Sequence, residues 1–127
     1  MFSPFVDWLL GNNPNLVINA KAVHQTKSFV EELLTFLPTK KEIDEQATFE
    51  EVIKWFSKNS PNPDIKKGVI CRKPDSQGEL IIQVFLDEND QVVRDANNRV
   101  LGRKFVVKNL DDELRETFGN SNVIIVE

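Results

Sequence analysis

The sequence predicts an α+β fold, in which N-terminal helices pack on one face of a mixed, mostly antiparallel sheet of four or five strands. Apolar residues of the first half mostly recur at helical spacing, whereas those of the second half mostly alternate along short runs bounded by turn residues. With 127 residues, 40% of them hydrophobic, the chain suits one domain around one core. We therefore expect a single domain over residues 1–127, with a helical half at about 1–60 and a β-rich half at about 65–127.

Two helices are expected before residue 38. Ser3 precedes a proline, which is a favourable start for a short helix over residues 4–10. Residues 19–37 carry apolar side chains at intervals of three and four and are expected to form the longest helix, although its start is uncertain. Pro38 ends this helix because proline disfavours helical geometry at the residue before it.

A third helix is indicated by the capping-box pair Thr48 and Glu51, which stands directly before an apolar run. This helix is expected to cover residues 49–58. The segment 40–47 before it is strongly charged and has no clear period. We expect it to be a frayed helix or an irregular connection.

Five strands are expected in the second half, over residues 69–72, 80–86, 91–94, 99–107 and 123–126. The strand at 80–86 is apolar on one face and partly apolar on the other, so it should be central. After it, an eight-residue pattern that begins at Asp87 repeats at Asp95. Aspartate and asparagine favour turns because they bond to their own backbone, so each copy predicts a hairpin turn followed by a short strand.

The C-terminal part predicts a strand–helix–strand unit. Asn109 is expected to cap a helix over residues 110–118, and Gly119 is expected to stop it. The apolar run 123–126 follows. A helix between two strands is typical of a right-handed parallel crossover, so we expect the last strand to lie inside the sheet.

The core is expected to be rich in aromatic rings, since the chain has nine Phe and two Trp but no Tyr. Six side chains are expected to be almost fully buried: Leu33, Trp55, Ile82, Val84, Phe105 and Ile124.

No catalytic, metal or cofactor site is predicted from the sequence. His24 is the only histidine, which excludes the usual zinc clusters, and Cys71 is interpreted as a buried structural thiol. A calcium loop beginning at Asp87 is disfavoured because Val92 stands where such a loop requires glycine. Nucleotide-binding glycine loops and paired-cysteine motifs do not occur.

Basic residues are concentrated in the middle of an otherwise acidic chain, whose formal net charge is −4. Residues 65–110 hold nine basic and six acidic side chains. We expect four arginines of this segment to form a binding site, with at least three converging on one exposed surface: Arg72, Arg94, Arg99 and Arg103. Arginine binds carboxylates and phosphates through a planar fork of donors, so this patch would attract an acidic partner. The alternative reading is that lysine and arginine simply occupy outward strand positions and discourage edge pairing.

These observations favour a non-enzymatic binding or regulatory module that acts through contacts with another, acidic protein. A nucleic-acid or nucleotide-binding protein that uses the basic segment is the alternative, and an undetected small hydrolase is the third reading. The N-terminus lacks the pattern of a secretory signal, and no apolar run approaches the roughly 18 residues of a membrane span. We therefore expect no membrane association. A single cysteine fits a reducing compartment, so we expect a cytoplasmic location.

Overall fold

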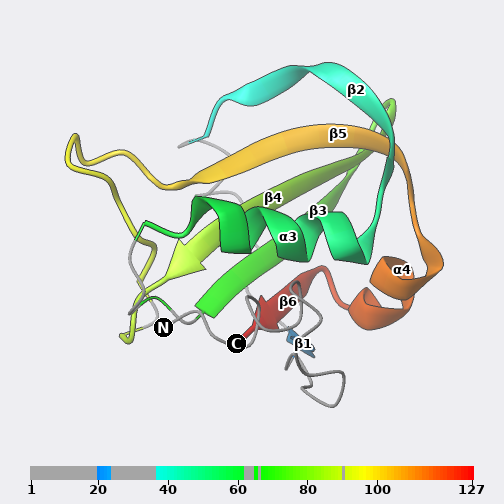
Figure 1. The fold of residues 1–127 in the computed structure, drawn as a ribbon. Coiled ribbons are helices and arrows are strands. Elements are labelled where there is room, and N and C mark those ends of the chain that lie inside the picture. The colour runs from blue at the N-terminus through cyan, green and yellow to red at the C-terminus, as the bar shows by residue number, and fades with distance from the viewer. Residues whose placement is uncertain (1–19, 24–36, 62–64, 66, 90) are drawn as a thin grey trace.

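Six strands and two helices make up the part of the chain that the computed structural model describes, which is residues 20–23, 37–61, 65, 67–89 and 91–127 (Figure 1). In chain order they are β1 (Ala20–Val23), β2 (Thr39–Ala47), α3 (Phe49–Asn59), β3 (Lys67–Asp75), β4 (Gly78–Leu86), β5 (Gly102–Leu110), α4 (Asp112–Phe118) and β6 (Val123–Val126). The α+β class is confirmed. The sheet has more strands than expected, and the described helices follow β2 and β5 instead of preceding the sheet.

The strands form one mixed sheet in the order β1-β6-β3-β4-β5-β2. All neighbouring pairs are antiparallel except β2 and β5, which are parallel. Strand β4 is central and β6 lies inside the sheet, as predicted. The predicted parallel crossover is wrong, because β3 and β4 separate β5 from β6 and the three antiparallel pairings make β6 run opposite to β5. The chain therefore leaves β5 and enters β6 at the same end of the sheet, where α4 lies (Figure 1).

The segment predicted as a frayed helix or irregular connection over residues 40–47 is instead most of strand β2. It is polar because it pairs with β5 and with no other described strand, so its side chains largely face solvent. Residues 20–23, placed in the predicted helix 19–37, form strand β1 beside β6. The rest of that helix, His24 and the helix predicted over 4–10 lie outside the described residues.

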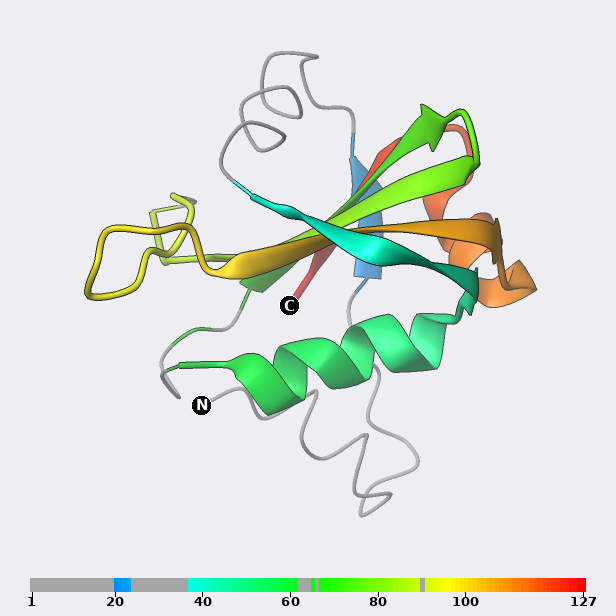
Figure 2. The ribbon, with the colours of Figure 1, turned by 90° about the horizontal axis from the view of Figure 1, so that it is seen from above.

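Helix α3 begins as the capping box predicts. The Thr48 hydroxyl accepts a hydrogen bond from the backbone N–H of Glu51 at 3.1 Å. The helix lies across one face of the sheet (Figure 2). Four of its side chains are buried there: Phe49, Val52, Ile53 and Phe56.

Apolar side chains form clusters on both faces of the sheet. The larger cluster joins α3 and α4 to inward residues of β3, β4, β5 and β6, and it includes Phe105 and Ile124. The second cluster, on the opposite face, includes Ile82 and Val84. These four residues are buried as predicted. Trp55 is only partly buried at the margin of the first cluster, which corrects the prediction, and Leu33 lies outside the described residues.

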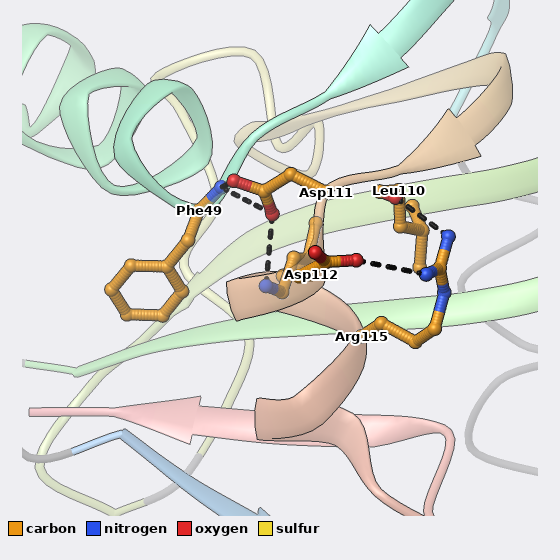
Figure 3. Close-up of polar contacts among 6 residues, drawn as sticks. Phe49, Leu110, Asp111, Asp112 and Arg115 are labelled. Atoms are coloured by element: carbon orange, nitrogen blue, oxygen red, sulfur yellow. Dashed lines mark hydrogen bonds and ion pairs between the residues drawn. The ribbon is translucent and has the colours of Figure 1, made fainter.

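Asp111 connects the beginnings of both described helices (Figure 3). It caps α4 by accepting from the Leu114 N–H at 2.9 Å, so the predicted cap at Asn109, which lies in β5, is wrong. Both carboxylate oxygens also accept from the N–H of Phe49, the first residue of α3, at 3.2 Å. The predicted stop at Gly119 is confirmed, since this residue is the C-cap with φ 57°.

A long connection between β4 and β5, residues 87–101, projects from the end of the sheet away from α4 (Figure 1); we call it the arm. The two predicted turns are present, and each is closed by its leading aspartate. In each, one carboxylate oxygen accepts from the N–H groups two and four residues later: Asp87 from Asn89 and Gln91, and Asp95 from Asn97 and Arg99. The strand predicted over 91–94 is reduced to isolated bridges, Leu86 to Val92 and Arg94 to Val100.

Candidate binding pocket

Arg72 is engaged in holding the end of α4. It lies on β3, and its Nη2 donates to the carbonyl oxygen of Gly119 at 2.9 Å. Its Nε donates to Oδ1 of Asn122 at 3.3 Å, and its guanidinium lies 4.6 Å from the ring centroid of Phe118. The contacts of Arg72 therefore stabilise the fold at the C-terminal end of α4.

Arg94 and Arg99 both lie on the arm and are exposed. The Nη1 of Arg94 donates to the carbonyl oxygen of Asn98 at 3.0 Å, within the second turn. The arm follows the last residue of β4, whereas Arg72 pairs with Ile81 near the middle of that strand, so Arg72 lies some way along the strand from the arm. The structure places Arg94 and Arg99 together on the arm, and the convergence of three of the four arginines on one exposed surface stays a prediction.

Arg103 lies on β5 and faces α3. Its Nε donates to Oε1 of the neighbouring Gln83 on β4 at 2.7 Å. Gln83 is fully buried, and its Nε2 donates to the carbonyl oxygen of Val52 in α3 at 2.8 Å. Because both ends of the glutamine amide are occupied, Arg103, Gln83 and α3 are held in a fixed relation.

Two aromatic rings flank the guanidinium of Arg103. Its central carbon lies 4.3 Å from the ring centroid of Phe105 and 5.2 Å from that of Trp55. Trp55 in turn stacks on Phe85, with centroids 5.4 Å apart and an interplanar angle of 25°. Cation–π attraction and close packing therefore orient the arginine side chain.

The charge of Arg103 is partly desolvated. Burial lowers the pKa of Arg103 from its ordinary value to about 10, and the negative charges of Asp44 and Glu51 oppose this shift. The guanidinium is therefore still protonated at neutral pH. Among the residues that the structure describes, Gln83 is its single hydrogen-bond partner and no carboxylate reaches ion-pair distance. The two terminal nitrogens thus retain hydrogen-bonding capacity.

These residues lie at a cavity of about 280 Å³ between β2 and α3, which we call the β2–α3 pocket. Its walls come from three elements: Asp44, Gln46 and Ala47 of β2, Glu51, Val52, Lys54, Trp55 and Lys58 of α3, and Arg103 and Phe105 of β5. On α3, residues spaced by three and four lie on one side of a helix, which is why Glu51, Trp55 and Lys58 can face β2 together. The pocket combines an aromatic wall with charges of both signs.

Sequence reasoning selected Arg103 but missed the residues that define its surroundings. Gln83 carried a signal, since a polar residue in a strand predicted to be central needs a buried partner. Asp44 and Gln46 carried none, because nothing in residues 40–47 indicates a strand beside α3.

Cys71 does not contribute to this pocket. It is fully buried on the opposite face of the sheet, and burial raises the pKa of its thiol to about 12. The thiol is therefore protonated at neutral pH and is a poor nucleophile. Within the described ranges, no group of three or more potential metal ligands is found.

Comparison of the chain with models of known protein families, with curated proteins and with solved structures gives no match. Neither of the described helices has the length and apolar character needed to cross a membrane.

Proposed function

We propose that this protein is a non-enzymatic binding module that holds a segment of another protein at the β2–α3 pocket. The observation that carries this proposal is the position of the pocket, between a helix and a strand at the edge of the sheet. Known peptide-binding domains use this arrangement, in which an extended segment lies along an edge strand and its side chains enter an adjacent pocket.

The edge of β2 supports this proposal. Within the described part of the chain, β2 pairs with β5 alone, so its other side presents backbone donors and acceptors. Exposed charges on this strand, such as Lys40 and Glu42, disfavour pairing between identical copies. A segment of another protein that carries complementary charges would not be repelled by the charged side chains of β2.

The chemistry of the pocket favours binding over catalysis. Its ionisable walls are Asp44, Glu51, Lys54, Lys58 and Arg103. Arg103 stays charged at neutral pH although burial lowers its pKa. The pocket walls therefore provide charge and hydrogen-bond complementarity, without the nucleophile and base pair that a hydrolase would place there.

The partner is proposed to be acidic and the location cytoplasmic. The pocket walls carry one more basic than acidic side chain, which supports an acidic partner. The single cysteine is buried as a protonated thiol, which suits a reducing compartment.

The proposal is tested by selecting random twelve-residue peptides on the full chain and mapping where they bind by NMR. We expect chemical-shift changes at residues 44–47, at Trp55 and at Arg103. Gln46→Trp, which places a large ring on the wall of the pocket, should weaken binding about tenfold or more, because it removes space that the peptide occupies. Gln91→Trp places the same ring on an exposed glutamine of the arm and should leave binding unchanged. Peptides that bind at the arm, or whose affinity is unchanged by Gln46→Trp, would contradict the proposal.

A further inference from the structure

We propose that the β2–α3 pocket recognises a carboxylate, and that Arg103 is the residue that binds it. The occupant would be a glutamate or aspartate side chain of the bound segment. This inference rests on the proposed function, since it names the chemical group that the binding module selects. It also makes Arg103 the specificity-determining member of the four arginines.

The hydrogen bond to Gln83 fixes how the guanidinium is presented. Nε is occupied by Gln83 at 2.7 Å, so the plane of the group is set by a residue that is itself fully buried. Nη1 and Nη2 make no hydrogen bond to the described residues. A guanidinium with free terminal donors binds a carboxylate through two N–H groups, in a geometry that lysine does not reproduce.

The aromatic walls strengthen such a pair. Phe105 and Trp55 lie against the guanidinium at 4.3 and 5.2 Å and limit its contact with water. An ion pair is worth more where the local dielectric constant is low. A bound carboxylate would also compensate the cost of burying the arginine charge.

The charges around the pocket leave room for one more carboxylate. Asp44 and Glu51 line the pocket but neither comes within ion-pair distance of Arg103, a statement that covers the described residues. Lys54 and Lys58 lie on the same walls, so three cations face two carboxylates. Asp44 is also paired with Lys40 at 3.2 Å, so part of the negative charge on these walls is already compensated, which favours an entering carboxylate.

The test uses two small probes, N-acetyl-glutamate N-methylamide and its glutamine counterpart, which have nearly the same shape. They are titrated into the full chain with ¹⁵N-labelled arginine and tryptophan side chains. We expect saturable shifts of the Arg103 Nε and Trp55 indole signals with the glutamate probe, and about tenfold weaker binding of the glutamine probe, because the charged hydrogen bonds are lost. Equal affinity for the two probes, or no saturable shift with either, would overturn the inference.

Variants then assign the selectivity to Arg103. Arg103→Gln should bind both probes equally, whereas Arg103→Lys should keep a reduced preference for glutamate because the charge remains but the fork is lost. Arg99→Gln removes the same charge from the arm and should bind as the wild type does. An unchanged backbone NMR spectrum outside the pocket shows that each variant is folded. Selectivity that survives in Arg103→Gln would refute the role of this residue.

Failure of this inference can be told apart from failure of the proposed function. Each acidic residue of the selected twelve-residue peptides is replaced by its amide, and binding is measured to the wild type and to Arg103→Gln. Losses of equal size in both chains would overturn the carboxylate site but leave the binding module intact. Conversely, a selective glutamate probe without any peptide bound at the pocket would support the carboxylate site and contradict the proposed function.

Discussion

At the scale of single residues, Gln83 illustrates how one polar side chain can organise a buried face. It is fully buried in the central strand, yet both ends of its amide are bonded, one to Arg103 and one to the carbonyl oxygen of Val52. The carbonyl of a helical residue already accepts a bond within the helix, and its second lone pair is free to accept this one. The glutamine thus links β4, β5 and α3 without leaving a polar atom unsatisfied, and no described side chain has a buried unpaired polar atom.

Cys71 leads to a prediction about reactivity and pH. Burial raises the pKa of its thiol from 9.0 to about 12, so the native protein at pH 8 should not react with a thiol reagent such as DTNB, while the urea-unfolded chain should react fully. Above pH 9 the unfolded state loses this proton and the folded state keeps it. The free energy of unfolding should therefore fall between pH 9 and pH 12 more steeply in the wild type than in Cys71→Ala. Equal labelling of native and unfolded protein would show that the thiol is accessible.

The structural roles of single residues were predictable from the sequence where local chemistry decides them. Thr48 is the cap of α3, Gly119 stops α4, and Asp87 closes its turn, because each of these roles depends on neighbours within four residues. Trp55 shows the limit. Its spacing on the helix indicates the core, but it lies at the margin of the cluster beside Arg103, and only the position of β5 decides that.

At the scale of elements, the shared cap at Asp111 couples α3 to α4. Asp111→Ala removes an acceptor from the first residue of α3 and from the first turn of α4 together. Loss of one cap typically costs about 1 kcal/mol, so we expect this variant to lower the free energy of unfolding by about 2 kcal/mol in urea melts.

Asp112→Ala is the matched control for this prediction. The carboxylate of Asp112 lies in the same turn as that of Asp111, but among the described residues it makes only an exposed ion pair with Arg115, at 3.2 Å. Exposed pairs contribute about 0 to 1 kcal/mol, so this change should be small. Equal destabilisation by the two variants would contradict the coupling role of Asp111.

The elements that sequence patterns missed are the ones whose environment is set from a distance. Strand β2 carries almost no apolar alternation, because it lies at an edge and its side chains are mostly solvated. The orientation of β6 relative to β5 depends on the two strands inserted between them, which no local pattern encodes. By contrast, α3 and β4 have strong periodic signals and were placed correctly.

At the scale of the whole molecule, the sheet is a middle layer with apolar clusters on both faces. Ile82 is fully buried in the cluster opposite α3. Ile82→Ala should lower the free energy of unfolding by about 2 to 5 kcal/mol, through lost burial and the cavity left behind. Ile43, which is 37% exposed on β2, provides the control, and Ile43→Ala should change stability by less than about 1 kcal/mol. Similar denaturation midpoints for both variants would show that the second face contributes little.

The candidate site also depends on the whole molecule. The sequence nominated Arg103 through the excess of basic residues in its segment. The pocket, however, requires β2 to lie beside α3 and to pair in parallel with β5. The residues of β5 that pair with β2 lie more than sixty residues later in the chain. This long-range pairing brings Asp44 of β2 near Arg103 and completes the pocket wall opposite α3.

The twin turns of the arm have a consequence for how the chain tolerates changes in length. Leu86 bridges to Val92 across the first turn, and Arg94 bridges to Val100 across the second, eight residues later. If one copy of the repeat, residues 87–94, were absent, Val100 would take the place of Val92 opposite Leu86, and Gly102 would still face Val84 as it does now. The register of β4 and β5 is thus independent of whether the repeat is present once or twice. A tandem duplication of eight codons would extend the arm while leaving the sheet, α3 and the pocket as they are.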